Sequence, residues 1–343
     1  MSNARGDHAT APGTTVPGAA GEQRRVLWSA PDLLAHEFEE PRWAVPGIVP
    51  EGLTLLAGAP KVGKSWLSLN LGVAVATGGR ALGSVSVEAG RVLYLALEDT
   101  PRRLRRRLET VLVDGTAPAG LAFAVDWPAM PDGGAERLDE TLTQAPDTRL
   151  VIVDVLAKVR GAVDGRSSLY DADYTAMGHL KAVADAHSVA VVVVHHVRKS
   201  GSDDFLETVS GTNGLAGASD TIAVLRRSRN TADAVLNITG RDVEEAEHAL
   251  KFDPACGLWS LLDGPAADYD LGDTRRAITR LLRESREALR PAQIAERLGL
   301  RADTVRQACS RMGRSGQLIS DGQGRYTTSI ATDQELSLDV PVP

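Results

Sequence analysis

The chain has 343 residues, enough for two domains with well-buried cores. Its 38 basic and 45 acidic residues give a net charge of −7, which argues against a protein that coats nucleic acid over its whole surface. The two cysteines, Cys256 and Cys309, are far apart and exclude a disulfide framework or a cysteine zinc site. An apolar signal core and a run long enough to span a bilayer are both missing, so we expect a cytoplasmic protein with no membrane partner.

The composition changes along the chain and predicts two folded domains between unstructured ends. Residues 1–27 are rich in Ala, Gly, Pro and Thr without an apolar period, so we expect them to be disordered. Gly, Pro, Ala and Asp return before residue 273 and are typical of a linker. The expected segments are a disordered tail over 1–27, a first domain over 28–262, a linker over 263–272, a second domain over 273–328 and a disordered tail over 329–343.

Apolar strands alternate with helices in the first domain. The expected strands cover residues 53–57, 91–97, 121–125, 150–153, 189–194, 221–225 and 234–239. The expected helices cover residues 31–35, 66–76, 101–113, 135–144, 169–187 and 215–218. This alternation predicts an α/β fold with a mostly parallel central sheet covered on both faces. In such sheets ligands bind beyond the carboxyl ends of the strands.

The first of these strands leads into a glycine-rich loop with the G-x-x-x-x-G-K-S spacing of a P-loop, followed by a helix. Backbone N–H groups and the positive end of that helix suit a phosphate chain, and the two glycines allow close approach. Lys64 would reach the β- and γ-phosphates, and the Ser65 hydroxyl would hold Mg²⁺. We therefore expect ATP to bind to the stretch Gly58, Ala59, Pro60, Lys61, Val62, Gly63, Lys64, Ser65 and Trp66.

Acidic residues follow two further apolar strands. Asp154 closes the strand over 150–153, as a Walker B aspartate does, and we expect it to hold Mg²⁺; the alternative is a strand-end cap. Glu98 and Asp99 follow the strand over 91–97, which we expect beside the P-loop strand. A carboxylate there can orient and deprotonate the water that attacks the γ-phosphate. We favour Glu98 over Asp99 because its side chain is longer and it is the first polar residue after the strand.

Histidine and arginine residues at other strand ends are further candidates. His195 and His196 follow four valines, and they lack a third ligand at a convincing spacing for a metal. We expect one to be structural and the other, His196 ahead of His195, to sense the γ-phosphate through a hydrogen bond. Arg241, on a Gly-Arg-Asp turn, either faces solvent or acts as an arginine finger on a neighbouring subunit's nucleotide. Arg226 and Arg227 are the alternatives for that finger, and the sequence does not decide among them.

The second domain reverses the charge of the chain. Residues 273–325 hold twelve arginines against six acidic residues, a local charge of +6. Helices over 273–289, 292–298 and 302–313, followed by a hairpin over 318–327, predict a winged helix-turn-helix. We expect its last helix to contact DNA, with a plain interaction module as the alternative. The candidate contact residues are Thr304, Arg306, Gln307, Arg311 and Arg314.

Another basic run, residues 102–107, lies in the first domain. It could touch a nucleic-acid backbone, or it could be a solvated helix face or a subunit contact.

Together these motifs resemble the RecA-like ATPases, specifically the RepA-type replicative helicases of plasmids, relatives of the DnaB and KaiC groups. The resemblance covers about residues 28–255 and rests on the ordered set 58–65, 95–99, 151–154, 195–199 and 210–220. It implies Lys64 and Ser65 on phosphate and metal, Glu98 as catalytic base, Asp154 on Mg²⁺, His196 as sensor and Arg241 near the finger. It also implies a ring, usually a hexamer, with nucleotide between subunits and single-stranded DNA in the centre.

Two features depart from the family pattern. The loop after the histidines carries acidic residues that would repel DNA phosphates, namely Asp203, Asp204 and Glu207. The basic residues in the preceding loop that could compensate are Lys158, Arg160 and Arg166. The winged helix is also no part of the minimal family helicase, and it suggests site-specific DNA binding or a partner contact.

These observations favour a ring-forming ATPase of the AAA class that acts on DNA. The leading expectation is a replicative helicase or translocase of a plasmid, phage or integrated element. The alternative is an ATP-switched DNA-binding regulator or loader that uses its winged helix and does not unwind DNA. A P-loop kinase for small molecules is the weakest candidate, because nothing in the sequence indicates an acceptor-binding lid.

Overall fold

The computed structural model describes residues 15–17, 23–25, 27–112, 115–162, 168–197, 213–227, 233–262, 271–285, 287–314 and 316–328. The chain divides into two compact units, and the smaller one contains all described residues from 271 onward. Among the described residues, none of the helices combines the length and apolar character needed to cross a membrane. Several residues considered above lie outside the described ranges, namely Arg166, Asp203, Asp204 and Glu207.

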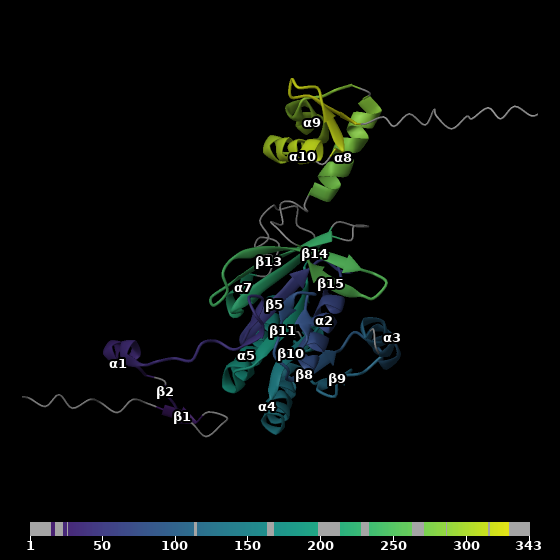
Figure 1. Ribbon diagram of the computed structural model, residues 1–343. Helices are drawn as coiled ribbons and strands as arrows, with labels where there is room; N and C mark the ends of the chain where they lie inside the picture. Colours follow the sequence, from purple (N-terminus) through teal and green to yellow (C-terminus); the bar gives the residue numbers. More distant parts are fainter. Residues whose placement is uncertain are drawn as a thin grey trace, which may run out of the picture. The chain divides into compact units, whose positions relative to one another are not determined.

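The larger unit is built on a nine-stranded sheet (Figure 1). In spatial order its strands are β15 (Leu258–Leu261), β14 (Ala246–Asp253), β13 (Asp233–Gly240), β12 (Thr221–Arg227), β5 (Gly52–Gly58), β11 (Ala190–His196), β10 (Thr148–Asp154), β8 (Arg91–Ala96) and β9 (Leu121–Ala124). All pairs from β12 to β9 are parallel, whereas β14 and β15 are antiparallel. The prediction of a mostly parallel α/β sheet is confirmed.

Helices cover both faces of this sheet. Their bounds are α2 (Lys64–Thr77), α3 (Pro101–Val111), α4 (Gly134–Gln144), α5 (Leu169–His187) and α7 (Asn213–Ala218). Alternate strand residues point to opposite faces. One set, including Leu55 and Val153, packs in a core with α4 and α5. On the other face α2 lies so close that a Cβ on Gly72 would be 3.3 Å from Cδ1 of Ile152.

The order of the strands differs from one expectation. We expected β8, which precedes Glu98, to lie beside the P-loop strand β5, and this was wrong. The neighbours of β5 are β11 and β12, and β10 lies between β11 and β8. A strand that is buried on both faces is apolar throughout, so its sequence carries no information about which strand lies next to it.

The remaining elements of the N-terminal half are short. They are β1 (Thr15–Pro17), β2 (Gln23–Arg25), α1 (Ala30–Ala35), β3 (Trp43–Val45), β4 (Val49–Pro50), β6 (Arg80–Ala81), β7 (Val85–Ser86) and the 3₁₀ turns η1 (Met130–Asp132) and η2 (Leu156–Lys158). Strands β1 and β2 form an antiparallel pair inside the tail that we expected to be disordered. Three residues per strand give such a pair little independent stability.

The described residues from 271 onward form three helices and a two-stranded antiparallel hairpin. These elements are α8 (Leu271–Ser285), α9 (Pro291–Leu298), α10 (Ala302–Arg314), β16 (Leu318–Ser320) and β17 (Tyr326–Thr328). They share a core of their own that includes Ile278, Ile294 and Val305. Helix α8 ends before the predicted residue 289, because the backbone of Leu289 pairs instead with that of Tyr326 at 2.9 and 3.0 Å.

Candidate nucleotide-binding site

The P-loop has a backbone that only glycine fits at its two ends. A Cβ on Gly58 would lie 2.6 Å from the carbonyl oxygen of Leu225, and a Cβ on Gly63 would lie 2.6 Å from Cζ2 of Trp259. Gly63 also has a φ of 114° at the N-cap of α2. The loop therefore presents bare backbone at the start of a long helix, where unpaired N–H groups and the helix dipole favour an anion.

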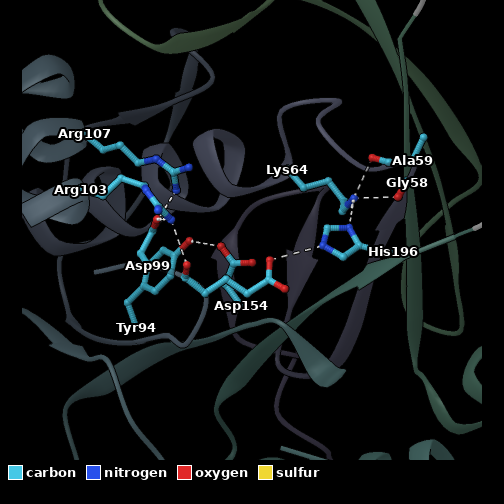
Figure 2. Close-up of polar contacts among 10 residues, drawn as sticks. Gly58, Ala59, Lys64, Tyr94, Asp99, Arg103, Arg107, Asp154 and His196 are labelled. Atoms are coloured by element: carbon cyan, nitrogen blue, oxygen red, sulfur yellow. Dashed lines mark hydrogen bonds and ion pairs between the residues drawn. The ribbon is translucent and has the colours of Figure 1, made fainter. Parts of the chain in front are cut away.

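The Lys64 side chain folds back onto the loop (Figure 2). Its Nζ donates to the carbonyl oxygens of Gly58 at 2.6 Å and Ala59 at 3.0 Å, and it lies 3.0 Å from Nδ1 of His196. Only 3% of the residue is exposed. Burial lowers the pKa of Lys64 to about 8, and the negative charges of Asp154 and Glu98 oppose that shift.

The Lys64 contact fixes the tautomer of His196. A lysine ammonium group has only donors, so Nδ1 accepts and the ring hydrogen is on Nε2. That Nε2 atom lies 3.5 Å from Oε2 of Glu98. The imidazole therefore connects the P-loop lysine to the carboxylate that follows β8.

His195 has a different environment. Burial lowers the pKa of His195 to about 4, and the electrostatic influence of His196, Lys64 and Arg160 acts in the same direction. The ring thus remains neutral at neutral pH, which suits the structural member of the histidine pair.

Asp154 is a buried carboxylate that is held on one side only. Its Oδ2 accepts a hydrogen bond of 2.8 Å from the hydroxyl of Tyr94, and the residue is 4% exposed. Within the described part of the chain, Oδ1 has no hydrogen-bond partner. Burial raises the pKa of Asp154, and the hydroxyl groups of Tyr94 and Ser65 oppose the shift. An oriented carboxylate with a spare oxygen beside a serine hydroxyl fits the oxygen ligands that Mg²⁺ prefers.

The structure separates the two acidic residues that follow β8. The side chain of Asp99 is 8% exposed, and its carboxylate binds the guanidinium groups of both Arg103 and Arg107. The side chain of Glu98 is 45% exposed and faces His196. Asp99 is thus occupied by two cations, whereas Glu98 is accessible to water.

The arginine candidates lie at opposite ends of the parallel strands. The N–H of Arg241 donates to the carbonyl oxygen of Asp220 at 2.9 Å, and Oδ2 of Asp220 accepts from the N–H of Leu53 at 2.8 Å. Leu53 is near the start of β5, so Arg241 lies at the amino-terminal ends of the strands, opposite the P-loop of its own chain. Arg226 and Arg227 end β12, which runs parallel to β5, and so lie at the P-loop edge.

The contributions of Trp259, Asn70 and Tyr94 to this region were not predicted from the sequence. Trp259 donates from Nε1 to the carbonyl oxygen of Gly63 at 3.3 Å, and its backbone N–H donates to Oδ1 of Asn70 at 2.7 Å. Strand β15 thereby holds both the P-loop and α2. Tyr94 orients Asp154. The position of Tyr94 inside an apolar run is the one feature of the sequence that could have indicated this contact, because a buried hydroxyl needs a polar partner.

A family model described as AAA domain matches residues 19–202, more than half of the chain. The DNA repair protein RadA from two strains of Mycobacterium tuberculosis is 30% identical over 187 residues. That match covers 54% of this chain but only 34% of RadA, so the chain spans about a third of the length of these curated relatives.

Among solved structures, a DnaB-like replicative helicase, reported with its interactions with primase, superposes with a TM-score of 0.51 at 15% identity. The superposition covers 63% of this chain and 58% of the helicase chain, and it concerns the fold alone. The family match, the RadA relative and the shared fold agree with the P-loop geometry described above. The chain therefore belongs to the AAA domain family, and its P-loop domain shares the fold of a DnaB-like helicase.

Proposed function

We propose that this chain hydrolyses ATP and acts on DNA as a RepA-like replicative helicase or translocase of a plasmid, phage or integrated element. The observation that carries the proposal is the convergence of four side chains at the carboxyl ends of parallel strands. Lys64 lies beyond the loop that follows β5, His196 ends β11 and Asp154 ends β10. Glu98 follows Leu97, the first residue after β8. A lysine, a buried carboxylate and an exposed carboxylate around one anion site suit phosphoryl transfer to water.

Each residue has a distinct role in this proposal. The backbone of residues 58–66 cradles the phosphates, and Lys64 binds the β- and γ-phosphate oxygens. Ser65 and Asp154 are the residues that would hold Mg²⁺, which neutralises phosphate charge when bound. Glu98 orients the attacking water and accepts its proton, since its carboxylate is accessible and Asp99 is occupied by arginines.

His196 is proposed as the γ-phosphate sensor. Lys64 cannot keep all of its contacts with Gly58, Ala59 and His196 while it binds phosphate oxygens. When the lysine turns toward the phosphate, Nδ1 of His196 loses its donor. The ring can then reorient, and because it ends β11 it links occupancy of the site to the segment beyond that strand.

We further propose a ring of subunits, with a hexamer as the size that the family resemblance implies, and the placement of Arg241 supports contact between subunits. Arg241 lies at the sheet edge opposite its own P-loop, and 68% of its side chain is exposed. It therefore serves as a finger only for the nucleotide of a neighbouring subunit. Single-stranded DNA in the centre of the ring is the proposed partner. The similarity to a DNA repair protein and to a DnaB-like replicative helicase supports an action on DNA.

The smaller unit favours a second candidate function. We propose that residues 273–328 form a winged helix-turn-helix with α10 as the DNA-reading helix. Val305 and Ala308 on α10 are buried, whereas Arg306, Gln307 and Arg314 are exposed. A module of this kind would suit an ATP-switched regulator or loader that binds a duplex site and does not unwind DNA.

One set of assays distinguishes the two candidates. Phosphate release from ATP is measured with the full chain alone, with single-stranded DNA and with duplex DNA, and Lys64→Ala serves as the blank. The helicase predicts stimulation by single strands and separation of a forked duplex. Tight binding of one duplex sequence, with hydrolysis indifferent to single strands, would instead support the regulator.

A further inference from the structure

We propose that Asp99 is a positioning residue that fixes the turn carrying Glu98 against the P-loop helix. It acts through two arginines of α3, and we call Asp99, Arg103 and Arg107 the Asp99 clamp. This inference rests on the proposed role of Glu98 in ATP hydrolysis, and it assigns a role to the acidic residue that does not itself activate water.

The clamp holds the turn at two points, the carboxylate of Asp99 and the main chain of Glu98, and Figure 2 shows both arginines at Asp99. Nη1 of Arg103 lies 3.1 Å from Oδ1 of Asp99 and also donates to the carbonyl oxygen of Glu98 at 3.0 Å. Nη1 of Arg107 binds Oδ2 of Asp99. One guanidinium group thus holds the side chain of Asp99 and the main chain of Glu98 together, so the peptide that carries the proposed base cannot rotate freely.

The helix that supplies the arginines is attached directly to the same turn. Thr100 caps α3 by accepting from the N–H of Arg103 at 3.3 Å, and Pro101 occupies the first turn of the helix. Proline at this position presets the helical φ, and the cap satisfies a free N–H. The hydrogen bonds and ion pairs of the clamp therefore join residues that are only a few positions apart in the chain. This restricts the backbone conformations that Glu98 can adopt.

The clamp also reaches the P-loop helix. Cζ of Arg107 lies 5.6 Å from the centroid of the Trp66 ring, within the range of a cation–π contact. Trp66 directly follows Ser65, the proposed Mg²⁺ ligand. The path Asp99–Arg107–Trp66 therefore sets the position of the proposed base relative to the residues that would hold phosphate and metal.

The other described arginines of α3 show that this arrangement is specific. Arg105 pairs with Glu109 along the exposed face of the helix, an ordinary surface pair whose side chains are 81% and 60% exposed. Such pairs contribute little. Asp99 is instead buried between two guanidinium groups. Two arginines of the basic run thus have a partner within the domain, and Arg107, whose side chain is only 25% exposed, is a poor candidate for contact with a nucleic-acid backbone.

The first test compares Asp99→Asn with Glu109→Gln, a carboxylate-to-amide change on α3, the helix of the two clamp arginines, that leaves the clamp intact. We expect Asp99→Asn to lower kcat for ATP hydrolysis by about 10- to 100-fold, because small misplacements of a reacting group have effects of this size. The affinity for ATP should change less than about twofold, because the substituted residue lies outside the ATP-binding stretch 58–66. Glu109→Gln should match the wild type in both. Wild-type kcat in Asp99→Asn would overturn the proposal.

The second test places Asp99→Asn in a Glu98→Gln background. If Asp99 acts through Glu98, it adds almost nothing there, so the two effects are not additive. An undiminished loss in the double variant would show that Asp99 acts elsewhere, and it would overturn the clamp. Unreduced hydrolysis in Glu98→Gln alone would instead contradict the proposed function.

A milder variant guards against misfolding. Arg107→Lys keeps the charge but loses the planar group that meets both Asp99 and Trp66. We expect it to give a smaller fall in kcat with an unchanged melting temperature, whereas wild-type kcat in this variant would also count against the clamp.

Discussion

Nζ of Lys64 lies 3.0 Å from Nδ1 of His196, so the P-loop lysine and the histidine that ends β11 are directly hydrogen-bonded. The contact joins the loop after β5 to the end of its neighbouring strand. It also explains how a lysine that is almost fully buried is kept among acceptors, with two carbonyl oxygens and one imidazole nitrogen around its ammonium group.

The first prediction concerns the pH dependence of ATP binding. The pKa of Lys64 is about 8 in the free protein, so its charge is complete well below pH 8 and is lost as the pH rises through that value. Phosphate binds the charged form, and ATP affinity should therefore fall above pH 8, approaching about tenfold per pH unit. Titrations with a fluorescent ATP analogue at pH 7, 8, 9 and 9.5 (roughly spanning the Lys64 pKa) measure this slope.

The control for that slope is Lys158→Met, which removes an exposed lysine outside the P-loop. It should leave the pH profile unchanged. A wild-type affinity that stays constant up to pH 9.5 (roughly the top of the tested range) would show that Lys64 does not titrate in this window.

The second prediction concerns Tyr94→Phe. The change removes the hydroxyl that donates to Oδ2 of Asp154 but keeps the ring in the core. A hydrogen bond to a charged group is worth about 1.5–3 kcal/mol, so the Mg²⁺ concentration for half-maximal hydrolysis should rise roughly tenfold or more. Tyr170→Phe, at a half-exposed site on α5, is the matched control. An unchanged Mg²⁺ requirement in Tyr94→Phe would contradict the proposed role of Asp154.

Most of this site could be predicted from the sequence, because its residues follow apolar strands or lie in a loop of fixed spacing. Glu98, Asp154 and His196 were singled out by their place at strand ends, and the structure brings them together with Lys64. The roles of these residues remain predictions. Strand order was not predictable, since a strand buried on both faces, such as β8, looks the same beside any neighbour.

The residues that hold the site in place were harder to predict than the residues proposed to bind and hydrolyse ATP. Strand β14 contains Glu247, His248 and Lys251 among its apolar residues, so its sequence did not predict a strand. Trp259 on β15 reaches Gly63 across 196 positions of sequence, and no local pattern indicates a contact of that kind. The arginines of α3 likewise read as a surface run, although Arg103 and Arg107 bind a buried carboxylate.

The third prediction compares two glycines. Gly63→Ala would place a Cβ 2.6 Å from Trp259 at a φ of 114°, so it should lower the melting temperature and abolish ATP binding. Gly178 lies inside α5, where a Cβ would have no described neighbour within 4 Å. Gly178→Ala should therefore stabilise the protein by about 0.5–1 kcal/mol. Thermal unfolding measures both, and a Gly63→Ala protein that binds ATP normally would refute the tight fit.

The fourth prediction tests the finger in trans. Arg241→Ala should leave ATP binding intact but slow hydrolysis by about 10³-fold, as loss of an arginine finger does. Mixing it with inactive Lys64→Ala should restore part of the activity, because some sites then combine an intact P-loop with an intact Arg241. The same mixing with Arg226→Ala distinguishes the alternative. If mixing with Lys64→Ala restores activity to Arg226→Ala but not to Arg241→Ala, the arginine finger is Arg226 on β12 and not Arg241.

The central claim is that Lys64 and Glu98 serve one ATP-hydrolysing site in different steps. The most direct test measures ATP binding and phosphate release in the wild type, Lys64→Ala and Glu98→Gln. The account predicts that Lys64→Ala loses both, whereas Glu98→Gln binds ATP like the wild type and hydrolyses it about 10²–10⁴-fold more slowly. Wild-type hydrolysis by Glu98→Gln, or unimpaired ATP binding by Lys64→Ala, would contradict it.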